Sequence, residues 1–132
     1  MKTIFTNGCF DILHIGHVRL LKFARAQGDR LVVGINSDKS VRRLKGESRP
    51  FFNEQERKEM LEALSCVDKV MIFEEDSAIQ LIKLIRPDLI VKGGDYKKED
   101  VLGAEYAEVL IFPFQKGYSS SKVLRPERAN EK

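Results

Sequence analysis

The sequence contains only two cysteines, Cys9 and Cys66, and they stand far apart in the chain. A disulfide framework needs more cysteines than this, and so does a zinc site built from four thiolates. No internal repeat, low-complexity segment or linker is visible either. A small disulfide-dense secreted domain is therefore excluded, and a reducing cytoplasm is the compartment that fits the sequence best.

Long apolar runs are also missing. Uncharged apolar runs are short, such as Leu31–Ile35, whereas a membrane-spanning helix needs about 20 apolar residues. The N-terminal segment carries one positive charge, but it has no long apolar stretch and no small-residue cleavage site. We therefore expect neither a transmembrane helix nor a secretory signal.

The excess of charge of one sign is small, with a formal net charge of +3 over 132 residues. The hydrophobic share of 42% and the charged share of 33% predict one folded domain, residues 1–124, followed by a polar tail, residues 125–132. Basic residues concentrate in one stretch: Lys39, Arg42, Arg43, Lys45 and Arg49. This cluster suits a phosphate ligand, since a nucleic-acid surface needs a longer basic stripe with aromatic partners. A solvated, charged helix face is the alternative.

Apolar runs alternate with segments of helical periodicity. The runs predicted as strands are Thr3–Thr6, Arg30–Asn36, Lys69–Phe73, Leu89–Lys92 and Glu108–Phe112. The segments predicted as helices are 16–27, a helix starting at Asn53, Ser77–Arg86 and a short one starting at Ser119. Nearly continuous apolar strands are typical of parallel sheets that are covered on both faces. The order predicts a single-domain, Rossmann-like α/β fold with an open, parallel, five-stranded sheet and helices on both faces.

Ligands bind to such a sheet beyond the carboxyl ends of its strands, so the segment after the first strand is informative. There Gly8 allows a tight turn, and the chain's only two histidines, His14 and His17, follow. If His17 opens the next helix, both imidazoles lie at a helix N-terminus and can donate hydrogen bonds to phosphate oxygens. Two alternatives stay open: structural histidines, and a metal site with Cys9, although that spacing fits no common zinc pattern.

The same stretch resembles the motif of the His-x-Gly-His nucleotidyltransferases. The motif reads His14-Ile15-Gly16-His17 here, and the family's Gly-x-Phe-Asp precedes it as Gly8-Cys9-Phe10-Asp11. The resemblance extends from Thr6 to Val123 through Gly34–Asp38, Arg42–Pro50, Val91–Tyr96 and Gly117–Ser121. Together these segments are similar to the heptose 1-phosphate adenylyltransferases, which make ADP-heptose for cell-surface glycans.

This resemblance implies transfer of AMP from ATP to a sugar 1-phosphate, D-glycero-β-D-manno-heptose 1-phosphate, with release of pyrophosphate. The catalytic residues it implies are His14, His17 and Lys45. The nucleotide-binding residues it implies are Asn7, Gly8, Cys9, Phe10, His14, His17, Lys92, Gly93, Asp95, Ser119, Ser120 and Ser121. The acceptor-binding residues it implies are Asp11, Asn36, Asp38 and Arg49. It further implies Mg²⁺ bound mainly through the nucleotide phosphates, with no protein metal site, and a homodimer. No nucleic-acid or membrane partner is expected.

The chain departs from that family at several points. Ser119-Ser120-Ser121 keeps the hydroxyls of the usual Ser-Thr-Thr, Gln115 and Lys116 stand where acidic residues are usual, and the segment between Asp95 and the last strand is shorter. These differences bear on the acceptor sugar more than on the transfer chemistry. The alternatives are a polyol-phosphate cytidylyltransferase, such as one for glycerol 3-phosphate, and a non-catalytic nucleotide-binding domain. Phe114 stands where the cytidylyltransferases carry an arginine, which favours ATP over CTP.

Overall fold

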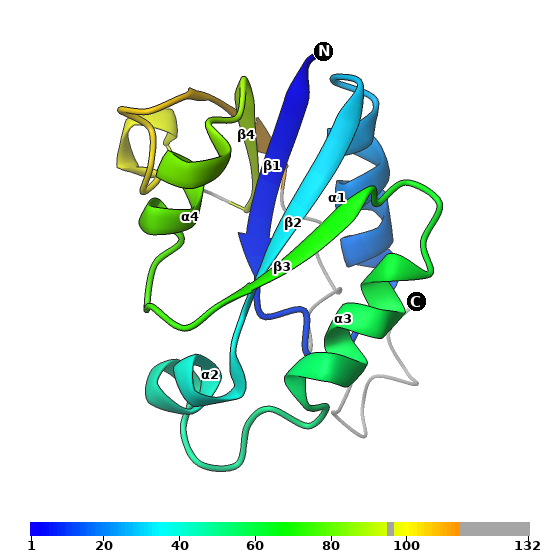
Figure 1. Cartoon of the computed structure of the whole chain (residues 1–132), viewed down its shortest axis with the longest axis vertical. Coiled ribbons are helices and arrows are strands. Elements are labelled where there is room, and N and C mark those ends of the chain that lie inside the picture. The colour runs from blue at the N-terminus through cyan, green and yellow to red at the C-terminus, as the bar shows by residue number, and fades with distance from the viewer. Residues whose placement is uncertain (95–96, 114–132) are drawn as a thin grey trace.

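The computed structural model describes residues 1–94 and 97–113, and within them a five-stranded sheet lies between helices on its two faces (Figure 1). The strands are β1 (Thr3–Gly8), β2 (Arg30–Asn36), β3 (Lys69–Phe73), β4 (Leu89–Gly93) and β5 (Glu108–Phe112). Their order in the sheet is β3-β2-β1-β4-β5, and every neighbouring pair is parallel. The predicted fold class is confirmed.

Alternate residues of each strand supply two separate cores, one on each face of the sheet. Helices α1 (Ile15–Arg25) and α3 (Glu54–Glu62) cover one face, where Ile4 of β1 belongs to the same cluster as residues of both helices. Helix α4 (Ile79–Ile85) covers the other face, where the next residue, Phe5, belongs to the second cluster. Burial on both faces fixes the central strands and brings their carboxyl ends to one edge of the sheet.

The hydrophobic pattern predicts no helix between β2 and α3, although a solvated, charged helix face is one of the two interpretations of the basic cluster. The structure has helix α2 (Asp38–Lys45) there, capped by the Ser37 side chain and ended by Gly46 at a φ of 101°. Val41 is the only apolar residue that this helix (DKSVRRLK) buries, so its sequence lacks the apolar periodicity that would predict a helix. Helix α2 lies beyond the carboxyl end of β2 (Figure 1). The basic cluster therefore lies mostly on a helix beyond the carboxyl ends of the strands. We call this end of the sheet its functional edge.

Smaller differences concern element ends. Helix α1 begins at Ile15 rather than at residue 16 or 17, and α4 begins at Ile79 rather than at Ser77. A short 3₁₀ helix, η1 (Lys98–Asp100), lies between β4 and β5. The predicted helix at Ser119 and the predicted tail, residues 125–132, lie outside the described residues. Within residues 1–94 and 97–113, no helix is both long enough and apolar enough to cross a bilayer.

Candidate active site

The two histidines form the N-terminal cap of α1. His14 is the N-cap residue, and its Nδ1 accepts a hydrogen bond from the Gly16 N–H at 3.1 Å. His17 stands three residues later, and its Nδ1 accepts from the His14 N–H at 3.3 Å. The rings stack with their centroids 3.8 Å apart. Because both Nδ1 atoms accept, each neutral ring carries its proton on Nε2, where it is a hydrogen-bond donor.

The ionisation of His17 is shifted strongly. The pKa of His17 is lowered from 6.5 to about 4, mainly by burial and also by electrostatic interaction with His14 and Lys45, while a hydrogen bond with the Ile12 backbone acts in the opposite direction. His17 is therefore neutral at neutral pH. The helix end thus offers a neutral donor next to the partial positive charge of the α1 N-terminus, which is a favourable arrangement for an anion.

The turn between β1 and α1 is tight. Phe10 has a φ of 47°, and its buried ring lies 5.0 Å from the His17 ring, centroid to centroid. A Cβ atom on Gly8 would approach that ring to 3.1 Å. Glycine at position 8 therefore lets the Phe10 ring close over the end of β1 and fix the position of His17.

Asp11, predicted to bind the acceptor, is buried and anchors a distant segment. Its carboxylate accepts hydrogen bonds from Arg49 Nε at 2.9 Å, from the Phe51 N–H at 2.9 Å and from the Phe52 N–H at 3.0 Å. Burial alone would raise the pKa of Asp11, but the two backbone N–H donors and Arg49 outweigh it, so the pKa lies below its usual value. Asp11 thus holds the segment between α2 and α3 against the β1–α1 turn.

One nitrogen of the Arg49 guanidinium takes no part in the ion pair with Asp11. Its Nη2 is buried and has no hydrogen-bond partner within the described part of the chain. A buried unpaired donor is unfavourable unless a ligand or water satisfies it. The structure therefore brings Asp11 and Arg49 together as an ion pair, and acceptor binding by either of them stays a prediction.

A buried arginine that the sequence reasoning missed joins the ends of β1 and β2. The Arg57 side chain on α3 is fully buried. Its Nη1 donates to the Cys9 carbonyl at 2.9 Å and to the Asn36 carbonyl at 2.7 Å. Its Nε donates to the Phe52 carbonyl at 2.9 Å, and its Nη2 pairs with Asp38 Oδ1 at 2.8 Å. One guanidinium thus connects the turn after β1, the end of β2, the start of α2 and the segment before α3 at the functional edge.

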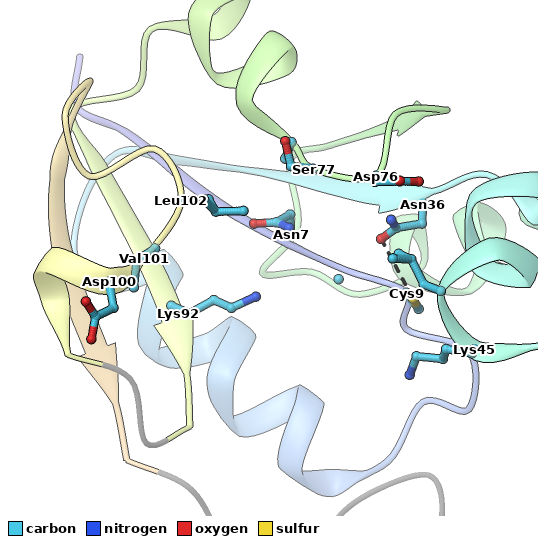
Figure 2. A pocket seen from close by; sticks show the side chains of 13 residues that line it. Asn7, Cys9, Asn36, Lys45, Asp76, Ser77, Lys92, Asp100, Val101 and Leu102 are labelled. Carbon is cyan, nitrogen blue, oxygen red and sulfur yellow. Dashed lines mark hydrogen bonds between the residues drawn. The ribbon is translucent and has the colours of Figure 1, made fainter.

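A pocket of about 580 Å³ opens at this edge (Figure 2). The residues that line it lie at the ends of β1, β2 and β4, in α2, in the segment before α4, and in η1 and the segment after it. The lining residues are Asn7, Gly8, Cys9, Asn36, Leu44, Lys45, Asp76, Ser77, Ala78, Lys92, Asp100, Val101 and Leu102. A single sugar phosphate or a comparable polar ligand fits this volume.

The pocket divides the predicted site residues into groups. Asn7, Gly8, Cys9, Asn36, Lys45 and Lys92 line it together. His14, His17, Asp38 and Arg49 lie nearby without lining it, Gly93 ends β4, and Phe10 packs beneath the turn. Asp95, Phe114 and Ser119–Ser121 lie outside the described residues. The structure thus gathers several of the predicted residues at one edge, and their roles stay predictions.

Two signals could have revealed the residues that were missed. Arg57 shares a helical face with Leu61 and Leu64, so a charge stands where the periodicity demands an apolar residue. Asp76 and Ser77 stand a few residues after the end of β3, and the rule that ligands bind after the carboxyl ends of strands applies to β3 as well.

Comparisons with known proteins find relatives over almost the whole chain. A family model described as cytidylyltransferase-like matches residues 5–125. The bifunctional protein HldE of Helicobacter pylori (strain P12) is 52% identical over 124 residues, which are 93% of this chain and 27% of that protein. HldE of Aliarcobacter butzleri is 50% identical over 132 residues, 99% of this chain and 28% of that protein. The chain thus spans little more than a quarter of the length of these relatives.

Solved structures share the fold. A lipopolysaccharide core biosynthesis protein from Thermoplasma volcanium has a TM-score of 0.71 and 30% identity, covering 90% of this chain and 99% of that one. A pantothenate synthetase from Thermus thermophilus has a TM-score of 0.70 at 18% identity, covering 98% of this chain and 64% of that one, and shows the fold alone.

Proposed function

Because the chain belongs to the cytidylyltransferase-like family, we propose that it is a nucleotidyltransferase that transfers AMP from ATP to a sugar 1-phosphate. The acceptor we propose is D-glycero-β-D-manno-heptose 1-phosphate, and the products are ADP-heptose and pyrophosphate. The observation that carries the proposal is the pair of histidines capping α1 beside a pocket lined by Lys45 and Lys92. The similarity to HldE and to a lipopolysaccharide core biosynthesis protein supports the choice of acceptor.

The end of α1 is the proposed site of the nucleotide phosphates. Helix N-termini bind anions through their N–H groups, and here two histidine rings lie at the same helix end. Neutral donors fixed in advance stabilise charge that grows as pyrophosphate leaves, because no reorganisation is needed in the transition state. The histidines therefore serve as binding and charge-stabilising groups rather than as bases.

The reaction needs no general base. A sugar 1-phosphate is already an anion, and one of its oxygens forms the new bond to the α-phosphorus of ATP. The bond from the α-phosphorus to the oxygen bridging it to the β-phosphorus breaks, and pyrophosphate carries away that electron pair. Catalysis then consists of alignment and charge stabilisation, which cations such as Lys45 provide.

We also propose Mg²⁺ as the metal, bound mainly through the phosphates. Within residues 1–94 and 97–113, no group of three or more histidine, cysteine, aspartate or glutamate side chains is placed to hold a metal ion. Mg²⁺ keeps several waters and commonly binds through substrate phosphates with few protein ligands, so this donor set fits it. The bound ion would share the charge of the triphosphate.

The location and assembly are further proposals. Both cysteines are free thiols, which suits a reducing cytoplasm. A homodimer is the assembly that the sequence resemblance implies.

Pyrophosphate release tests the proposal. The purified chain is incubated with each of the four nucleoside triphosphates and with heptose 1-phosphate, other sugar 1-phosphates or glycerol 3-phosphate. We expect the fastest release with ATP and heptose 1-phosphate. Release only with CTP and a polyol phosphate would identify a cytidylyltransferase, and nucleotide binding without release would identify a non-catalytic domain.

A further inference from the structure

Asn36 is the last residue of β2, and a chain of hydrogen bonds holds its side chain. The residue is buried, and it lines the pocket together with Cys9. Its amide Nδ2 donates to Ser40 Oγ on α2 at 3.0 Å, and its Oδ1 accepts from the Cys9 thiol at 3.7 Å. The Ser40 hydroxyl in turn donates to the Glu75 carbonyl at 3.1 Å. The chain of hydrogen bonds thus runs from the turn after β1, through Asn36 and Ser40, to the segment after β3.

The Ser40 hydroxyl determines which way the Asn36 amide is turned. A hydroxyl has one proton and a carbonyl oxygen can only accept, so Ser40 must donate its proton to Glu75. Ser40 Oγ can then only accept from Asn36, and the amide atom that faces it must be the nitrogen. An amide turned over would place two acceptors against each other with no proton between them, which is unfavourable in a buried site. Because Ser40 is fully buried, bulk water cannot take the place of either partner.

The fixed amide provides a hydrogen-bond acceptor at the end of β2. Its Oδ1 points toward Cys9, another residue of the pocket lining (Figure 2). A carbonyl oxygen has two lone pairs and a thiol is a weak donor, so Oδ1 can accept a second, stronger hydrogen bond from a ligand. A hydroxyl group can supply that bond. An unprotonated phosphate oxygen cannot, because it is itself only an acceptor.

We infer that Ser40 is a positioning residue that fixes the Asn36 amide so that its Oδ1 accepts a hydroxyl group of the bound ligand. The inference rests on the proposed function, which supplies two ligands with hydroxyl groups, the acceptor sugar and the ribose of ATP. Ser40 does not line the pocket, so it acts only through Asn36. Asn36 thereby selects a ligand with a hydroxyl group at one position and disfavours an anionic group there.

Ser37 provides a matched control on the same helix. Like Ser40 it is a buried serine, and its hydroxyl caps α2 by accepting from the Ser40 N–H at 3.2 Å. Ser37→Ala therefore removes an equivalent hydroxyl and weakens the same helix, but it leaves the hydrogen bonds of the Ser40 side chain in place. If the role of Ser40 were only structural, Ser40→Ala and Ser37→Ala would behave alike.

The test compares substrates with their deoxy analogues. The analogues are monodeoxy forms of heptose 1-phosphate, 2′-deoxy-ATP and 3′-deoxy-ATP, and the measured quantity is the ratio of kcat/KM for each parent to that of its analogue. This ratio does not depend on the fraction of folded enzyme. In the wild type and in Ser37→Ala, we expect one analogue to be about tenfold to hundredfold poorer than its parent, since Oδ1 then stays buried without the ligand's donor. In Ser40→Ala, we expect the same ratio to fall below about threefold, mainly because the parent reacts more slowly.

The analogue that shows this effect identifies the source of the hydroxyl group, either the sugar or the ribose. If Ser40→Ala does not fold, Ser40→Cys keeps a side chain of similar size. It should lose the discrimination as well, because sulfur is a weak acceptor for the Asn36 Nδ2–H.

Hydrogen exchange of the Asn36 side chain gives a second readout that does not depend on turnover. Its NH₂ signals in NMR are identified by their absence in Asn36→Asp. Since Nδ2 donates to a fully buried hydroxyl, we expect these protons to exchange slowly in the wild type. They should exchange much faster in Ser40→Ala than in Ser37→Ala.

The inference is overturned if the wild type discriminates against none of the analogues, if Ser40→Ala keeps the wild-type ratios, or if Ser37→Ala loses them to the same extent. Equal exchange of the Asn36 amide in the two alanine variants overturns it as well. Failure of the proposed function looks different, because the wild type then transfers AMP to no sugar phosphate. The exchange rates still decide in that case whether Ser40 fixes the Asn36 amide.

Discussion

Replacing Arg57 by methionine removes four interactions of one buried side chain. The guanidinium donates to the carbonyl groups of Phe52, Cys9 and Asn36 and pairs with the Asp38 carboxylate. Methionine fills a similar volume but donates nothing, so three carbonyls and one carboxylate lose their donor. Arg57 therefore offers the sharpest test of how the functional edge is held together.

The size of the effect follows from these contacts. Three carbonyl groups left without a donor cost about 1 kcal/mol each, and the loss of the ion-pair partner adds roughly 1–2 kcal/mol because Asp38 is partly exposed. The sum of about 4 kcal/mol agrees with the 3–5 kcal/mol typical of breaking a buried pair. For a domain of this length, 1 kcal/mol corresponds to about 3–4 °C, so we expect Tm to fall by about 12–16 °C.

The assay is thermal unfolding followed by circular dichroism, with Arg42→Met as the control. Arg42 is an exposed arginine on α2, and its replacement should shift Tm by less than about 2 °C. Adding Asp38→Asn to Arg57→Met should recover part of the loss, since the carboxylate is then no longer charged and unpaired. If Arg57→Met melts within about 3 °C of the wild type, the reasoning about this buried network is refuted.

Three further predictions concern the histidines and Asp11. His14→Ala and His17→Ala should each lower kcat by on the order of 10²-fold or more while the chain stays folded, and near-normal turnover in both would contradict their role. His17 should titrate in the ligand-free protein with a midpoint of about 4 in NMR, and a midpoint above 6 would contradict the structure. Because this pKa lies below the usual 6.5, the histidine's contribution to stability is complete above pH 6.5 and is lost as the pH falls toward about 4. Asp11→Asn should speed hydrogen exchange at the Phe51 and Phe52 amides, and unchanged exchange rates there would show that Asp11 does not hold that segment.

The sheet could be predicted from the sequence because each of its strands is visible as a short run of apolar residues. The apolar run Arg30–Asn36 alternates with helical segments, and parallel strands buried on both faces leave that pattern directly in the chain. Helix α2 could not be found in this way, since it lies at the edge of the sheet and buries one apolar side chain. Its existence depends on a serine cap and on contacts with segments far away in the sequence.

Several residues of the predicted site lie together in the structure, but the interactions between them could not be predicted. Asp11 and Arg49 are separated by 38 positions, and nothing local indicates that the carboxylate binds the guanidinium. From the sequence alone, a charged residue that follows a strand can be interpreted equally well as a ligand-binding residue or as one partner of an ion pair. The histidine motif predicted the helix N-terminus, but the cap, in which both Nδ1 atoms accept backbone N–H groups, is visible only in three dimensions.

The most direct test of the central claim is a competition between equal concentrations of ATP and CTP, with D-glycero-β-D-manno-heptose 1-phosphate as acceptor and Mg²⁺ present. Mass spectrometry of the products identifies the sugar nucleotide that forms. We predict ADP-heptose, formed with stoichiometric pyrophosphate and with ATP consumed faster than CTP. Faster consumption of CTP, or the absence of any sugar nucleotide, would contradict the claim that this chain transfers AMP to a sugar 1-phosphate.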